Sequence, residues 1–136
     1  MENEIRDDKI HISINSIIFE DDLELNKLML SSLTGSDSRI SKVVYHLKKD
    51  TFKFADDNWY ELINNRWEKS YNMDKFILYE LSRYYEVIIS YVENSKELTY
   101  EQKNSTIKEI KKIISKLENI NSEINIIKVA SMRFHV

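Results

Sequence analysis

Paired carboxylates are the first residues of this 136-residue chain whose spacing suggests chemistry. Adjacent acids occur at Asp7-Asp8, Asp21-Asp22 and Asp56-Asp57. Carboxylate oxygens bind Mg²⁺, but neighbours on a strand point to opposite faces, and acids are also common at helix starts and turns. We therefore expect these pairs to cap helices and form turns, and we predict no metal site.

The other reactive residue types are too few or too scattered for a catalytic centre. The three histidines form no His-x-x-x-His pair, and we expect His46 to hydrogen-bond Asp50 one helical turn later. There is no cysteine, and no serine lies in a glycine-flanked elbow. Phosphate-binding loops need several glycines so that backbone N–H groups can converge, and Gly35 is the only one. We predict no catalytic residues, no cofactor and no enzyme activity.

An aromatic and basic group remains, centred on the stretch NWYELINNRWEKS. Residues 58–70 contain both tryptophans, Trp59 and Trp67. These rings could cover the core, since a three-stranded sheet needs a large apolar face. With Lys53, Arg66 and Lys69 they could instead form a surface for single-stranded nucleic acid, where bases stack on rings and cations pair with phosphates. The residue types alone favour packing.

Apolar spacing predicts the N-terminal elements. Isoleucines alternate with polar residues along Lys9–Phe19, which predicts a strand. Asp21-Asp22 then favours the start of a helix that ends at Gly35. In SDSRISKVVYHLKKD, apolar residues at i, i+3, i+4 and i+7 from Ile40 predict a second helix.

The aromatic stretch reads as three antiparallel strands over residues 51–70. Asparagine tolerates the positive φ angles of a two-residue hairpin turn, so Asn64-Asn65 can connect two of these strands. That register places Leu62 opposite Trp67 and Tyr60 opposite Lys69. It also places Glu61 opposite Glu68, an unfavourable like-charge pair. A longer loop with a bulge would relieve this pair and remains open.

Three more helices follow the strands. One covers MDKFILYELSRYYEVIISYVENS, and the next begins with the capping-box pair Thr99 and Gln102. The last, SEINIIKVASMRF, is expected to bury Ile124, Ile127, Ala130 and Phe134. The predicted fold is α+β and mostly α, with about five helices, a small three-stranded antiparallel sheet and an N-terminal strand.

Charge is distributed unevenly along the chain. The net charge is −3, but residues 1–37 contain nine acids and three bases, whereas residues 38–136 contain fourteen acids and seventeen bases. This asymmetry favours a polyanion-facing C-terminal part or, more simply, a solvated surface of mixed charge. No apolar run reaches the roughly eighteen residues of a membrane span. We expect an intracellular protein with no membrane partner.

One known module has a similar order of elements and motifs. The matching segments are SRISKVVYHLKKDTFKF, DNWYELINNRWEKS and IKEIKKIISKLENINSEINIIKVASMRF, which together lie within roughly residues 36–134. They resemble the domain that precedes the superfamily 3 helicase in the replicative helicase-primases of poxviruses and giant DNA viruses, and related modules of satellite-phage primases. The specific part is the W-Y-x-L-x-x-x-R-W motif of Trp59, Tyr60, Arg66 and Trp67. We expect this motif to be mainly structural.

The resemblance implies a non-catalytic DNA-replication module. In such proteins the domain is a collar between a primase and an AAA+ ATPase, and it helps the helicase ring assemble and passes DNA to the motor. The implied partners are an AAA+ helicase domain or protein, single-stranded or duplex DNA, and further copies in a ring. Catalytic residues of the family lie in the flanking domains, so none carries over.

The chain is then expected to consist of an acidic N-terminal segment, residues 1–35, packed on a collar-like domain, residues 36–136. The segment occupies the place of the primase, so the chain is either part of a larger protein or a stand-alone protein with only the collar fold. For the second case, the alternative function is a protein–protein adaptor or inhibitor of a nucleic-acid enzyme, whose acidic segment docks on a basic partner.

Weak DNA contact is predicted at basic residues on the sheet and the helices beside it. They are Lys48, Lys49, Lys53, Arg66, Lys69, Lys108, Lys111 and Lys112.

Overall fold

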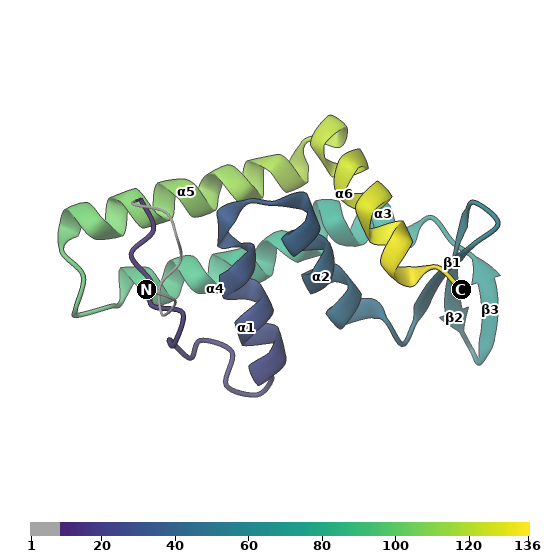
Figure 1. Cartoon of the computed structure of the whole chain (residues 1–136), viewed down its shortest axis with the longest axis horizontal. Coiled ribbons are helices and arrows are strands. Elements are labelled where there is room, and N and C mark those ends of the chain that lie inside the picture. Colours follow the sequence, from purple (N-terminus) through teal and green to yellow (C-terminus); the bar gives the residue numbers. More distant parts are fainter. Residues whose placement is uncertain (1–8) are drawn as a thin grey trace.

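A computed structural model describes residues 9–136 and shows an α+β fold that is mostly α, as predicted (Figure 1). The elements of this part of the chain are α1 (Leu23–Ser31), η1 (Ser32–Thr34), α2 (Asp37–Lys48), β1 (Phe52–Ala55), β2 (Asn58–Ile63), β3 (Arg66–Lys69), α3 (Asn72–Lys75), η2 (Phe76–Glu80), α4 (Leu81–Glu93), α5 (Tyr100–Glu118) and α6 (Ile120–Phe134). Segments α3, η2 and α4 follow one another without a break. The described residues therefore form five helices and one three-stranded sheet.

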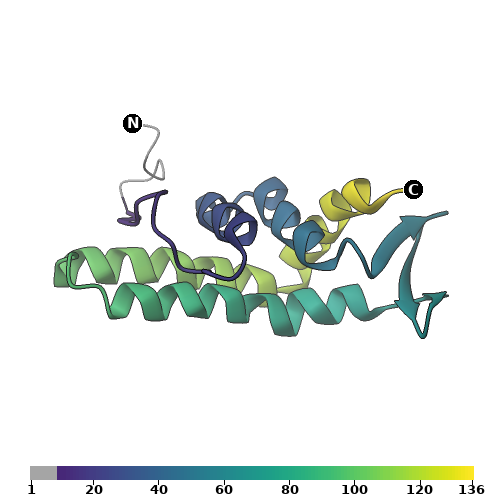
Figure 2. The same cartoon turned by 90° about the horizontal axis from the view of Figure 1, so that it is seen from below.

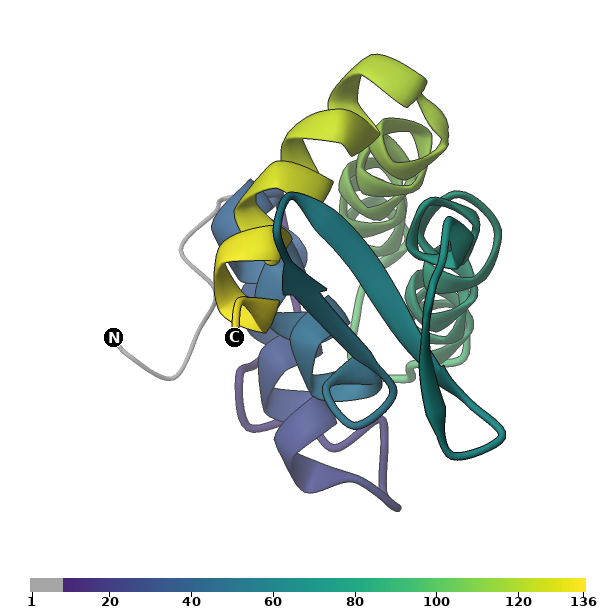
Figure 3. The same cartoon turned by 90° about the vertical axis from the view of Figure 1, so that its right-hand side faces the viewer.

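The helices form two layers beside the sheet. Helices α4 and α5 lie side by side as a long pair in both Figure 1 and Figure 2. Figure 2 shows α1, α2 and α6 on one side of this pair, with the sheet at one end of the molecule. Figure 3 views the molecule from that end, with the strands in front of the helices.

One hydrophobic cluster joins the N-terminal segment to the rest of the molecule. Ile10, Leu25 and Met29 belong to the same buried cluster as Val44 and Ile113. Burying a side chain of this size contributes about 1.5–3 kcal/mol. Residues before and after position 35 therefore share one core.

The predicted N-terminal strand over Lys9–Phe19 is wrong. No strand forms there, and only Ser13 makes an isolated bridge. Side chains of other elements bond parts of this segment's backbone: Asn26 Oδ1 accepts from the N–H groups of Ile18 and Phe19, at 2.7 and 2.9 Å. The alternating isoleucines Ile10 and Ile12 are therefore buried at the edge of the core without belonging to a strand. The acidic pair at residues 7–8 lies outside the described residues.

Asp22 joins the start of α1 to the end of α2. Its Oδ1 accepts from the N–H of Leu25 at 2.9 Å, which confirms the expected cap. Its Oδ2 lies 2.8 Å from His46 Nε2. The expected His46–Asp50 hydrogen bond is therefore wrong, because helix packing brings a carboxylate from another element to the imidazole. The Leu25 N–H and then His46 hold the pKa of Asp22 below its usual value.

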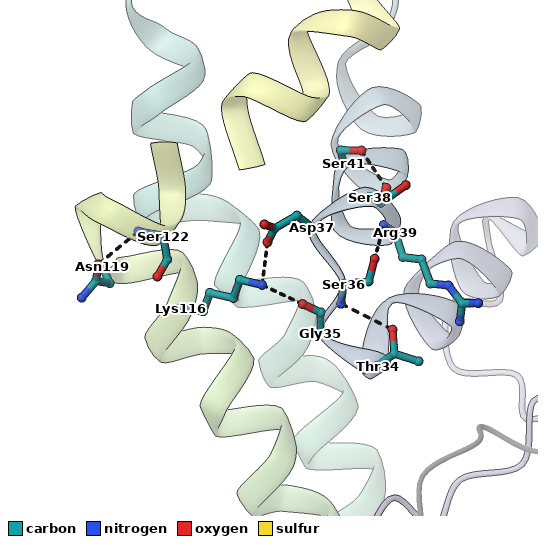
Figure 4. A network of polar contacts seen from close by, with 10 residues as sticks. All are labelled: Thr34, Gly35, Ser36, Asp37, Ser38, Arg39, Ser41, Lys116, Asn119 and Ser122. Carbon is teal, nitrogen blue, oxygen red and sulfur yellow. Dashed lines mark hydrogen bonds and ion pairs between the residues drawn. The ribbon is translucent and has the colours of Figure 1, made fainter. Parts of the chain in front are cut away.

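Gly35 forms the turn between the first two helices. Its φ of 84° is in the left-handed region, where a glycine costs least. Figure 4 shows Lys116 reaching this turn from α5: its Nζ donates to the Gly35 carbonyl at 2.7 Å and pairs with the Asp37 carboxylate. Ser36 caps α2 by accepting from the Arg39 N–H at 3.3 Å. These contacts attach the start of α2 to α5.

The sheet has the order β1-β2-β3 and is antiparallel throughout. Both connections are two-residue turns, and Asp56, Asp57, Asn64 and Asn65 have positive φ values between 51° and 65°. This confirms that Asp56-Asp57 and Asn64-Asn65 form turns. Positive φ at both central residues is typical of the type I′ turn of a β-hairpin.

The predicted register of the second hairpin is correct and contains no bulge. Glu61 does lie opposite Glu68. Glu61 Oε1 accepts hydrogen bonds from Ser70 Oγ at 2.9 Å and from Asn72 Nδ2 at 2.7 Å. These donors stabilise the Glu61 carboxylate, and Glu68 is exposed to water, which is how the like-charge pair is tolerated.

The buried face of α6 differs from the expected one. Ile124 was expected in the core but is 51% exposed. Glu123 and Ile126 are buried instead, together with Ala130 and Phe134. The inward face therefore runs through residues 123, 126, 130 and 134, and a carboxyl group occupies an interior position.

None of the helices formed by residues 9–136 is both long enough and apolar enough to cross a lipid bilayer.

Candidate nucleic-acid interface

The pleat of the sheet sorts its side chains onto two faces. Paired residues of an antiparallel sheet share a face, and successive residues alternate between faces. The inner face carries Phe52, Phe54, Trp59, Glu61, Ile63, Arg66 and Glu68. The other face, called the open face below, carries Lys53, Ala55, Asn58, Tyr60, Leu62, Trp67 and Lys69.

The inner face packs against α6 through Trp59. Its ring centroid lies 5.1 Å from that of Phe134 and 5.2 Å from that of Phe54, both edge to face. Phe52 makes a third edge contact at 6.5 Å. Edge-to-face pairs of this kind add to the free energy of burial. Trp59 is therefore partly buried and packs against the core.

The open face presents Trp67 to solvent. This ring is 41% exposed, and Lys53 Nζ lies 4.5 Å from the centroid of the ring. Directly after β3, Tyr71 is 71% exposed, and Lys69 Nζ lies 5.9 Å from its ring. Trp67 and Tyr71 are thus aromatic surfaces that each have an ammonium group beside them. Cation and ring attract each other at these distances.

Charge is separated between the two faces. The open face contains two lysines and no acidic residue, whereas Glu61 and Glu68 lie on the inner face. Asp56 and Asp57 are exposed in the β1–β2 turn, next to this face. The strand residues of the open face therefore have a net positive charge, which favours an anionic ligand.

Some of the other predicted DNA-binding residues lie near the sheet but off this face. Arg66 is exposed at the start of β3 and lies on the inner side of the pleat. Lys48 is at the end of α2, and its Nζ lies 4.6 Å from the ring of buried Phe76. Lys49 follows it as an exposed residue at the helix end. None of these three cations belongs to the open face.

The remaining three predicted residues lie elsewhere. Lys108, Lys111 and Lys112 are exposed on α5, off its buried face. Helix α5 begins at the end of the molecule opposite the sheet and runs back toward the centre (Figures 1 and 2). Lys112 is also paired with Glu109 at 3.1 Å. The structure therefore does not bring the α5 lysines and the sheet cations into one surface.

Two features of the open face were missed in the sequence. Across the two-residue turn at Asn64-Asn65, the residue numbers of each cross-strand pair add up to 129. An odd-numbered residue of β2 therefore pairs with an even-numbered residue of β3, and the two side chains share a face. Trp59 and Trp67 must then lie on opposite faces. Tyr71 lies beyond the end of β3, and the contact of Lys69 with its ring places it beside the open face.

Residues 9–136 contain no group of three or more His, Asp or Glu side chains placed to hold a metal ion.

Two comparisons with known proteins do not assign a family: no family model matches the chain, and no curated protein matches it.

Proposed function

We propose that this chain is a non-catalytic DNA-replication module of the helicase-primase type, and that the open face of its sheet contacts DNA. It aids assembly of a helicase ring and guides DNA toward an AAA+ motor that lies outside this chain. The observation that supports DNA contact is the position of Lys53 over solvent-exposed Trp67 on a face without acids. The replication assignment rests on the resemblance of the Trp-Tyr-Leu-Arg-Trp motif.

Within this proposal the two halves of the motif have different roles. Trp59 holds the sheet on α6 through its contact with Phe134. Trp67 contacts solvent and is free to meet a ligand. Lys53 and Lys69 supply phosphate contacts from the same face, and Arg66 adds a cation at the tip of the hairpin.

DNA binding can be measured by fluorescence anisotropy with labelled single-stranded and duplex DNA at low salt. Each phosphate contact releases counterions from the DNA, so affinity falls as the salt concentration rises. A variant that has lost two phosphate contacts should show a slope of log binding constant against log salt concentration that is smaller in magnitude by about 1.4–1.8. We expect the double variant Lys53→Gln/Lys69→Gln to show this reduced slope and weaker binding. Absence of any binding by the wild-type chain would contradict the proposed contact with DNA.

The matched control is Lys108→Gln/Lys111→Gln on α5. It removes the same charge from a surface away from the sheet. We expect it to bind more tightly than the sheet variant. Equal losses in the two double variants would show that binding follows net charge and not the open face.

Ring assembly has a separate test. A superfamily 3 helicase domain is mixed with this chain, and the mass of the complexes is measured by light scattering with and without DNA. We expect the chain to increase the fraction of helicase in rings. A helicase whose assembly is unchanged would contradict the replication role and leave DNA binding to be judged on its own data.

A further inference from the structure

The open face presents flat aromatic rings beside its lysines, and this combination favours one class of nucleic acid. We infer that the site is selective for single-stranded nucleic acid and that an unpaired base stacks on the Trp67 indole. This inference rests on the proposed function, since it specifies the ligand of the same face. It commits to base stacking in addition to phosphate contact.

The surroundings of Trp67 are suited to stacking. It lies on β3, which is an edge strand of the sheet, and pairs with Leu62 across the open face. The side chain over the ring is Lys53, with its ammonium group 4.5 Å from the centroid. A lysine has a long flexible stem, so this ammonium group can move from the ring to a nearby phosphate. The ring face that it leaves is then available to a base.

A second ring extends the surface along the chain. Tyr71 follows Trp67 by four residues, with Lys69 between them, and it is the more exposed of the two rings. Lys69 Nζ lies within 5.9 Å of the Tyr71 centroid. An alternation of ring, cation and ring matches a single strand, which alternates bases with phosphates. Proteins that bind single strands combine these same two elements.

Stacking explains why a duplex is the poorer ligand. In a duplex, neighbouring base pairs already cover both faces of each base, so an exposed indole can stack only on the base pairs at the duplex ends. An unpaired base offers its whole face. Stacking of one base raises affinity by roughly 5- to 150-fold, whereas phosphate contacts act on both forms.

The test compares strands of equal charge with and without bases. Binding of a dT strand of about 15 nucleotides, a matching abasic strand and a duplex is followed by anisotropy and by tryptophan fluorescence. We expect dT to bind at least about fivefold more tightly than the abasic strand and to quench fluorescence. Trp67→Ala should reduce this difference and leave abasic binding unchanged, Trp67→Phe should retain more of it, and Trp67→Ala/Tyr71→Ala should abolish it.

Tyr79→Ala is the matched control, because Tyr79 is an exposed aromatic residue of η2. It should bind dT as the wild type does. Equal affinity for dT and abasic strands would overturn the stacking inference and leave the proposed DNA contact intact. No binding to any strand would contradict the proposed function itself. An rU strand that quenches the tryptophan fluorescence and binds more tightly than dT would support stacking and would assign the face to RNA instead of DNA.

Discussion

Trp59 and Trp67 lie on opposite faces of one β-hairpin, although they are only eight positions apart in the sequence. Trp59 packs on Phe134, whereas Trp67 contacts Lys53 and solvent. The same motif therefore supplies one residue to the core and one to the surface. The structure makes these two roles separable by mutation.

Truncation of the two tryptophans should have unequal effects on stability. Trp59→Ala removes three aromatic contacts, and we expect it to lower the free energy of unfolding by about 2–4 kcal/mol. Trp67→Ala should cost less than about 1 kcal/mol, because the ring is partly in water. Urea unfolding followed by circular dichroism measures both. A Trp67 variant as unstable as the Trp59 variant would show that the outer indole is structural.

The Asn64-Asn65 turn predicts opposite effects of two substitutions. Both residues have positive φ, at 53° and 65°. Asn65→Gly should leave the melting temperature unchanged or raise it slightly, because glycine adopts this conformation easily. Asn64→Val should cost about 1–2 kcal/mol, because a β-branched side chain clashes there. Thermal unfolding of both variants is the measurement, and an equally stable valine variant would mean that the turn has another conformation in solution.

Glu123 should make stability depend on pH. Burial, and secondarily the nearby charge of Asp74, raises the pKa of Glu123 to about 7, and its Oε2 has no hydrogen-bond partner among the described residues. Since the unfolded-state pKa is near 4.5, the unfolded chain releases this proton first as the pH rises. Stability is therefore expected to fall by roughly 2–3 kcal/mol between about pH 4.5 and 7, and to level off above.

Two variants check the assignment to Glu123. Glu123→Gln should lack this loss and be more stable than the wild type at pH 8, because it cannot ionise. Asp74→Asn removes a like charge and should reduce the loss only in part, because burial is the larger cause. Urea unfolding at pH 5 and pH 8 measures both effects. A Glu123→Gln variant with the pH profile of the wild type would exclude Glu123 as the source.

Asp22 should stabilise the start of α1 through a cap that asparagine can partly replace. Asp22→Ala loses the hydrogen bond to Leu25 and the contact with His46, and we expect a loss of about 1–2 kcal/mol. Asp22→Asn keeps the capping oxygen and should lose less. The pKa of Asp22 is lowered from 3.8, so its contribution is present above this pH and disappears as the pH falls through the folded-state pKa. Chemical unfolding at pH 6 and pH 3 separates the three proteins, and equal stabilities at pH 6 would show that the cap contributes nothing.

Local sequence determined much of the fold. Thr99 and Gln102 form the expected capping box, with Gln102 N–H donating to Thr99 Oγ1 at 3.1 Å and Thr99 N–H donating to Gln102 Oε1 at 3.0 Å. Asn64-Asn65 determined the turn, and the turn length determined the register of the hairpin. Such features depend on residues close together in the chain. Backbone conformation and short-range hydrogen bonds are sufficient to predict them.

Tertiary structure decided which partner each side chain meets. His46 bonds Asp22 and not Asp50, because packing places the start of α1 beside the end of α2. The isoleucines of the N-terminal segment enter the core without forming a strand, and Glu123 is buried where Ile124 was expected. Phe134 of α6 covers the Trp59 face of the sheet and leaves the Trp67 face open. The spacing of apolar residues shows that a face exists, but only the packing of distant elements determines which face is covered.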